Sequence, residues 1–171
     1  TAKQSIILEF SPTIMSLILA GKVGSNIASE LGSMRVTEQI DALEIMGINT
    51  KAYLIRPKII AAVLIFPIVI IFSMAFGFGG GWLAAFGTGL IPEDQYIVGI
   101  QSFYDDNLWM ITYALIKTTV FAFIITSVSS YHGYYTSGGA LEVGKSSTNA
   151  VVYSSVLILL ANLLLTQLLL I

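Results

Sequence analysis

Three long apolar runs dominate the hydrophobic pattern of the chain. Each is 20 residues or more in length and contains at most one charged side chain. About 20 apolar residues are enough to cross a bilayer as a helix. The pattern therefore predicts three membrane-spanning helices, at about 59–78, 107–131 and 147–171.

A fourth span is expected at about 5–29, where the apolar pattern is interrupted by Glu9, Pro12 and Lys22. Small residues recur there every four positions, a spacing that lets helix backbones approach closely in lipid. Three uses of this row stay open: packing inside the bundle, a dimer interface, and a groove facing a substrate. The residues of the row are Ala20, Gly24, Ala28 and Gly32. The expected fold is all-α, a polytopic membrane helix bundle forming a single membrane domain over 1–171.

The connections between the expected spans differ in character. The glycine-rich stretch 79–92 is predicted to leave the membrane and turn along its outer face as an interfacial segment. Pro67 is predicted to kink the span at 59–78, because proline removes a backbone hydrogen bond.

The segment 30–58 carries an amphipathic pattern. Apolar or small residues fall at i, i+4, i+7 and i+11, which predicts one short helix within 30–48 that stops at Gly47. Helices that lie on membranes are usually rich in Lys and Arg on their polar face, whereas this one has more acids than bases. A protein partner is therefore favoured over the membrane surface.

Charges in the connections predict the orientation. The connection at 30–58 holds Arg35, Lys51, Arg56 and Lys58, and the one at 132–146 holds Lys145. The connection at 91–106 has no basic residue and four acids: Glu93, Asp94, Asp105 and Asp106. Because Lys and Arg mark the cytoplasmic side, the first and third connections are expected in the cytoplasm, and the C-terminus on the outer side.

Composition narrows the class of protein further. Hydrophobic residues make up 56% of the chain and charged residues 11%, well below the roughly 25% charged residues of soluble domains. A net charge of −2 gives no reason to expect nucleic acid as a partner. With no cysteine and His132 as the one histidine, no metal site is expected. The sequence opens on Thr1, and we expect it to lack its true N-terminus.

Residues 139–146 read GALEVGKS, which matches the phosphate-binding pattern G-x-x-x-x-G-K-[ST]. That loop needs a preceding buried strand and an α/β domain, and here membrane spans flank the string. We therefore interpret Gly138, Gly139 and Gly144 as a tight turn, with Ser146, Ser147 and Thr148 as caps of the last helix. A membrane-bound P-loop NTPase is therefore not the expected function, and no catalytic residue is predicted.

Lys117 is the candidate functional residue inside the membrane. It lies ten residues into its span, hence roughly 15 Å deep at 1.5 Å per residue. A charge at that depth is costly and marks either a function or a specific pair. Three roles stay open: a structural pair, for which Glu9 is the candidate, contact with a lipid phosphate, and snorkelling to the membrane surface.

Several stretches carry a resemblance to a known family. ELGSMRVTEQIDALEIMGI (30–48) is similar to the signature segment of MlaE-type permeases, the membrane subunits of lipid-transporting ABC systems. EFSPTIMSLILAGKVGSNIASELG, YLIRPKIIA and LIKTTVFAFIITSVSSYHGY resemble the neighbouring parts of that family, as does GGALEVGKSSTNAVVYSSVLILLANLLLTQLLL. Two positions depart from the family pattern: Ser11 replaces a frequent glycine, and Asn162 replaces a usual aspartate.

The resemblance implies a permease subunit without catalysis of its own, located in the bacterial inner membrane. It implies a homodimer that docks on a separate cytoplasmic ABC ATPase, where ATP and Mg²⁺ bind. It also implies a periplasmic MCE-domain protein, in some systems a STAS-domain protein, and phospholipid as the cargo. By analogy, the residues coupling the ATPase to the spans are Glu30, Arg35, Glu38, Gln39, Asp41 and Glu44. The alternative function is a helical scaffold or channel that works without an ATPase.

Overall fold

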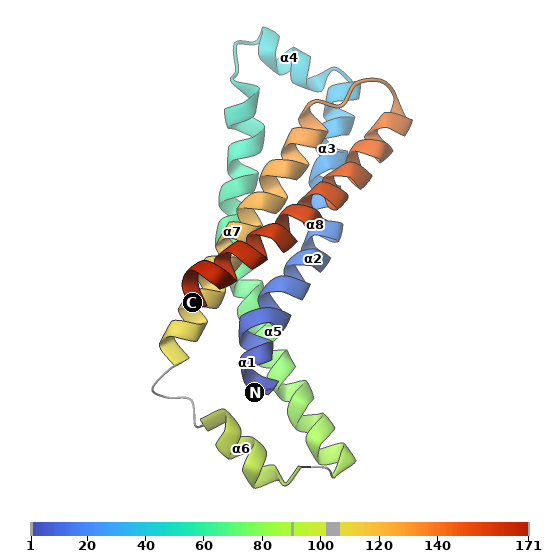
Figure 1. Ribbon diagram of the computed structural model, residues 1–171. Coiled ribbons are helices and arrows are strands. Elements are labelled where there is room, and N and C mark those ends of the chain that lie inside the picture. Colours follow the sequence, from blue (N-terminus) through green and yellow to red (C-terminus); the bar gives the residue numbers. More distant parts are fainter. Residues whose placement is uncertain (1, 90, 102–106, 171) are drawn as a thin grey trace.

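The computed structural model describes residues 2–89, 91–101 and 107–170, and it is an elongated helical bundle (Figure 1). All regular elements of these described residues are helices, and none is a strand, which confirms the expected all-α fold. Asp105 and Asp106 of the expected acidic connection lie outside the described residues.

Four helices are long and apolar enough to cross a membrane, as expected. The first is composite: α1 (Ala2–Ser5), the π-helical η1 (Ile6–Ile14), α2 (Met15–Leu19), the π-helical η2 (Ala20–Gly24) and α3 (Ser25–Val36). The second joins the π-helical η3 (Lys51–Ile55) to α5 (Arg56–Thr88). The other two are α7 (Asn107–Tyr134) and α8 (Ala140–Leu170), and two short helices, α4 (Gln39–Ile45) and α6 (Glu93–Gln101), lie at opposite ends of the bundle.

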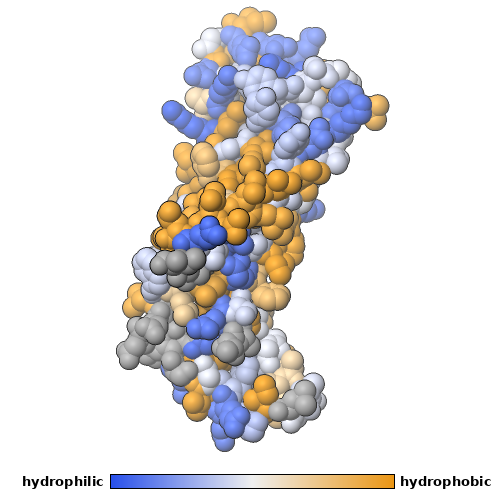
Figure 2. All heavy atoms as spheres, in the orientation of Figure 1, coloured by the Kyte–Doolittle hydropathy of each residue, from blue (hydrophilic) through white to orange (hydrophobic). Residues whose placement is uncertain are grey.

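Helix α7 is central, because it packs against the composite first helix, α5 and α8. A core cluster joins all four long helices through residues such as Ala20, Phe66, Phe121 and Ile158. Figure 2 shows the hydrophobic residues gathered in the middle of the molecule, with more hydrophilic residues toward the α4 end. This distribution is what a bilayer requires of a spanning bundle.

The row of small residues is buried inside the bundle: Ala20, Gly24, Ala28 and Gly32 are all covered. A Cβ on Gly24 would lie 2.8 Å from the Ser129 hydroxyl oxygen. Gly133 of α7 faces the row, and a Cβ there would lie 2.7 Å from the Ala28 carbonyl oxygen. Of the three uses left open by the sequence, these contacts favour packing inside the bundle.

Helix α5 corrects the prediction for 79–92, because it runs through the glycine-rich stretch to Thr88. Tertiary contact compensates for the weak helix propensity of glycine: the Tyr96 hydroxyl reaches past Gly81 and donates to the Phe78 carbonyl at 2.8 Å. The helix ends at Gly89, whose φ of 63° is the left-handed conformation that glycine adopts easily. The helix is continuous through Pro67.

The amphipathic segment is two helices rather than one, so this prediction was wrong in part. Residues 30–36 extend α3, and Glu38 then adopts a left-handed conformation with φ of 61°, which separates α3 from α4. The predicted stop is confirmed: Gly47 has φ of 78°. The Gly47 and Ile48 amides donate to the carbonyls of Glu44 and Leu43 at the end of α4, the arrangement of a Schellman cap.

The predicted turn before the last span is present at Gly138 and Gly139, where Gly138 has φ of 114°. The predicted caps were wrong, since α8 begins at Ala140. Gly144 and the expected capping residues therefore lie inside the helix. Ser146 accepts a hydrogen bond from Thr136 at 2.8 Å, and Ser147 donates to the Ser25 carbonyl at 3.3 Å. These two hydroxyls thus bond to neighbouring elements, and the string 139–146 forms no phosphate-binding loop.

Candidate functional site

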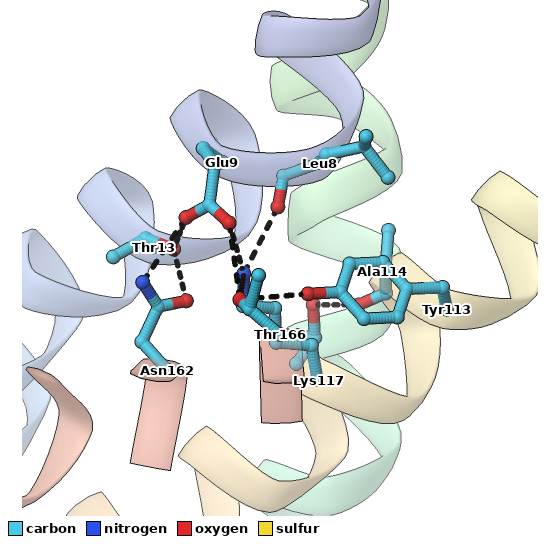
Figure 3. Close-up of polar contacts among 9 residues, drawn as sticks. Leu8, Glu9, Thr13, Tyr113, Ala114, Lys117, Asn162 and Thr166 are labelled. Atoms are coloured by element: carbon cyan, nitrogen blue, oxygen red, sulfur yellow. Dashed lines mark hydrogen bonds and ion pairs between the residues drawn. The ribbon is translucent and has the colours of Figure 1, made fainter. Parts of the chain in front are cut away.

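Glu9 and Lys117 face each other inside the bundle (Figure 3). The Lys117 ammonium nitrogen lies 2.8 Å from a Glu9 carboxylate oxygen. The Lys117 side chain is 0% exposed, whereas the Glu9 side chain is 43% exposed. The pair therefore joins a fully buried cation to a carboxylate that reaches the surface of the bundle.

The local structure of the first helix provides a free carbonyl acceptor at this site. A regular α-helix would bond the Leu8 carbonyl to the amide of residue 12, but Pro12 has no N–H. The Lys117 ammonium donates to that carbonyl at 3.1 Å. Glu9 itself belongs to the π-helical segment η1, and π-helical turns are frequent at functional sites.

Side chains from α7 and α8 complete the cluster around Glu9. The Asn162 amide donates to one carboxylate oxygen at 3.1 Å, and the Thr166 hydroxyl donates to the other at 3.3 Å. Tyr113 and Thr166 share a hydrogen bond of 3.0 Å, and Thr13 lies 3.2 Å from the same Glu9 oxygen as Asn162. The Glu9 carboxylate thus ties its own helix to α7 and α8.

This geometry bears on the three roles left open for Lys117. Its zero exposure rules out snorkelling, and the Glu9 carboxylate provides the specific pair. The Tyr113 ring, 5.1 Å from the ammonium, covers it further. Contact with a lipid phosphate stays a prediction, and in this structure Glu9 is the anionic partner of Lys117.

A second polar network lies at the α4 end. Arg35, in the last turn of α3, pairs with Asp41 of α4 at 2.9 Å and lies over the Tyr134 ring at 5.0 Å. The Tyr134 hydroxyl, at the end of α7, donates to Glu44 at 3.0 Å and lies 2.8 Å from the Thr50 hydroxyl. Together these contacts connect α4 to α3, α7 and the start of the second long helix.

The other expected coupling residues lie close by but outside this network. Glu30 pairs with Lys58 of α5 at 2.7 Å. Glu38 and Gln39 are exposed at the junction of α3 and α4. Ile40, which is completely buried, anchors α4 against the bundle.

Reasoning from the sequence did not find Tyr134, Thr50, Tyr113 or Thr166. Tyr134 and Thr166 bond to charged groups 49 or more positions away. Tyr113 bonds to Thr166, which is 53 positions away. Thr50 bonds to Tyr134, which is 84 positions away, and also to nearby Glu44. Their partners are set by helix packing, which leaves no local pattern. Asn162 could be singled out from the sequence, because it departs from the usual family residue. Its contact with Glu9 could not be predicted from the sequence.

The described residues contain no group of three His, Cys, Asp or Glu side chains placed to hold a metal ion. His132 stacks on Tyr153 of α8 with ring centroids 5.1 Å apart, the packing role of a polar aromatic residue.

Comparison with known proteins places these features in a family. The model of the family described as permease MlaE matches residues 1–168. A probable ABC transporter permease of Rickettsia typhi is 39% identical over 165 residues, which cover 96% of this chain and 63% of that protein. A probable ABC transporter permease of Synechocystis sp. is 37% identical, covering 96% of this chain and 62% of that protein.

A chloroplast relative in Arabidopsis thaliana, named trigalactosyldiacylglycerol 1, is 37% identical over 93% of this chain and 45% of its own length. The chain spans a little over three-fifths of the length of the Rickettsia and Synechocystis relatives. The match over 1–168, the four spans and the identities together show that the chain belongs to the MlaE permease family.

Proposed function

We propose that the chain is the membrane-spanning part of an ABC-type permease that moves phospholipid between the inner membrane and the outer envelope. A separate cytoplasmic ATPase drives the movement, and ATP and Mg²⁺ bind there. The observation that carries the proposal is the network at the α4 end. It ties a short, exposed helix to the ends of two spans through Arg35 and Tyr134.

Helix α4 is suited to receive a partner. Ile45 is 87% exposed and Met46 is 66% exposed at its end, while Ile40 holds its other face in the bundle. A displacement of α4 by the ATPase would pull on α3 through the Arg35–Asp41 pair and on α7 through the Glu44–Tyr134 hydrogen bond. The role of this network is mechanical, with no chemical step in this subunit.

A lipid cargo is supported by the character of the spans. Large apolar side chains cover the outer faces of α5 and α8, and an ion or sugar path would need a polar lining at membrane depth. Glu9 and Lys117 provide paired charges at that depth, which suit a phosphate headgroup once they separate. A relative named for a glycerolipid points to the same class of cargo.

The remaining parts of the proposal concern assembly and placement. The α4 end lies in the cytoplasm, because Arg35, Lys51, Arg56 and Lys58 gather there. The C-terminus then lies on the periplasmic side. The working unit is a homodimer with an MCE-domain protein above it and, in some systems, a STAS-domain protein below it.

Reconstitution of the full-length protein tests the proposal. The permease is purified with a tag, and co-purification of an ATPase, ATP hydrolysis and transfer of labelled phospholipid between vesicles are measured. Arg35→Ala is expected to keep the ATPase bound while lipid transfer per ATP falls, because α4 loses its charged link to α3. Lys22→Ala, which removes an exposed cation on the same long helix, serves as the control and is expected to behave like the wild type.

A scaffold or channel is the alternative, and the same preparation separates it from a transporter. If no ATPase co-purifies with the protein and no lipid is transferred, the permease function is contradicted. Ion flux through vesicles holding the protein alone would support the channel instead.

A further inference from the structure

A cavity of about 520 Å³ lies at the α6 end of the bundle, away from the Glu9–Lys117 pair. Its walls are α5, α6 and the first turns of the composite helix, with Ile6, Phe78, Ala85 and Ile100 among its lining residues. Ligand pockets for small molecules typically measure about 300–1,000 Å³. The size therefore suits a ligand, and the lining is mainly apolar.

Several polar groups of the lining are engaged with main-chain carbonyls. The Tyr96 hydroxyl donates to the Phe78 carbonyl, and the Thr88 hydroxyl donates to the Ala84 carbonyl. The Lys3 ammonium donates to the Gly99 and Ile100 carbonyls at 3.1 and 3.3 Å, which are acceptors in the last turn of α6. Apart from the positive charge of Lys3 at its edge, the cavity is therefore matched to an apolar ligand rather than to a sugar.

The side chains beside the cavity include aromatic residues typical of a membrane interface. Trp82 and Phe86 stack on α5 with ring centroids 5.9 Å apart, and they line a smaller neighbouring cavity that shares Ala85 and Tyr96 with the first. Tryptophan gathers at the level of lipid headgroups. Lys3, the one charged side chain among the described lining residues, is complementary to a phosphate at that level.

From this geometry we infer a second lipid subsite: the cavity between α5, α6 and the N-terminal turns holds one acyl chain of a glycerophospholipid, with the phosphate on the Lys3 side. The Tyr96 hydrogen bond to α5 and the Lys3 hydrogen bonds to α6 hold α6 against the bundle and so close the cavity on that side. The subsite rests on the proposed lipid transport and extends it, because it would hold a lipid at the opposite end of the bundle from α4.

Photolabelling of the full-length protein tests this subsite. The probe is phosphatidylethanolamine with a diazirine near the end of one acyl chain, in nanodiscs, and labelled positions are mapped by mass spectrometry. Label is expected on Ile6 and Ile100, on the walls that face α5. Ala84→Trp, which places a large ring in the cavity from an exposed lining position, is expected to abolish that label. Ala75→Trp, at an exposed position of α5 outside the lining, is expected to retain it.

Equal labelling of Ile6 and Ile100 in both variants would overturn the subsite. Absence of label there in the wild type would also overturn it, and a crosslink from another protein segment into the cavity would identify protein as the occupant. The resting protein is labelled without ATP or an ATPase, so failure of this experiment is distinguishable from failure of the proposed transport.

Discussion

Lys117 depends more on Glu9 for compensation of its charge than Glu9 depends on Lys117. The ammonium is fully buried, and its acceptors are Glu9, the Leu8 carbonyl and the Thr166 hydroxyl. The carboxylate is partly exposed and keeps neutral donors on Asn162 and Thr166. Removing one partner of a buried pair costs about 3–5 kcal/mol of stability when a charge is left uncompensated. Loss of Glu9 and loss of Lys117 should therefore differ in their cost.

We therefore expect Glu9→Leu to lower the melting temperature of the purified full-length protein more than Lys117→Leu does. Lys117→Leu is expected to leave folded protein and to impair lipid transfer. The double variant Glu9→Leu/Lys117→Leu is expected to recover most of the stability, because no buried charge remains. Equal losses in the two single variants would contradict this asymmetry, and wild-type transfer by Lys117→Leu would exclude a functional role for the lysine.

Helix α4 is positioned by contacts with other elements more than by its own seven residues. Isolated helices of fewer than about 12 residues are marginal in water. Here Ile40 is buried against the bundle, and the Tyr134 hydroxyl of α7 bonds Glu44 and Thr50 on either side of the Gly47 stop. Tyr134 is thus the point where α7 fixes the end of α4 and the segment that follows it.

Tyr134→Phe is expected to keep the ring that Arg35 covers while removing both hydroxyl contacts. ATP hydrolysis by the assembled transporter should continue, and phospholipid transferred per ATP should fall. Tyr53→Phe is the matched control, since Tyr53 is 62% exposed. An unchanged transfer ratio in Tyr134→Phe would show that this hydroxyl does not carry the coupling.

The whole bundle depends on close approach between α3 and α7. Gly133 makes this approach possible, because a Cβ there would lie 2.7 Å from the Ala28 carbonyl and 2.8 Å from the Leu31 Cβ. The Ala28 carbonyl belongs to the backbone, which cannot rotate out of contact as a side chain can. Association of helices in lipid relies on such packing, since lipid tails are as apolar as the side chains.

Gly133→Val is expected to force α3 and α7 apart and to lower the melting temperature clearly, because overpacking a tight seam typically costs about 1–3 kcal/mol. Gly21→Val, where the added Cβ meets no atom within 4 Å, is the control and is expected to change little. Similar losses in both variants would mean that helix propensity, and not the seam, sets the stability.

The hydrophobic pattern was sufficient to predict the number of long helices, their approximate positions and the all-α class. Each follows from runs of apolar residues that a bilayer must bury. The pattern could not give the helix ends. Local propensity suggested a turn at 79–92 and a capped helix start near Ser146, and tertiary contacts of Tyr96 and Ser147 accompany the longer helices found instead.

From the amino-acid sequence alone follow a membrane bundle, a charged amphipathic connection at one end of it, and a single lysine deep in its third span. The folded bundle was needed to learn that Lys117 meets Glu9, that Asn162 and Thr166 complete the cluster, and that Tyr134 holds α4. The physical reason is the range of each interaction. Partition into the membrane depends on residues adjacent along the sequence, whereas a buried charge is compensated by whichever helices the packing brings beside it.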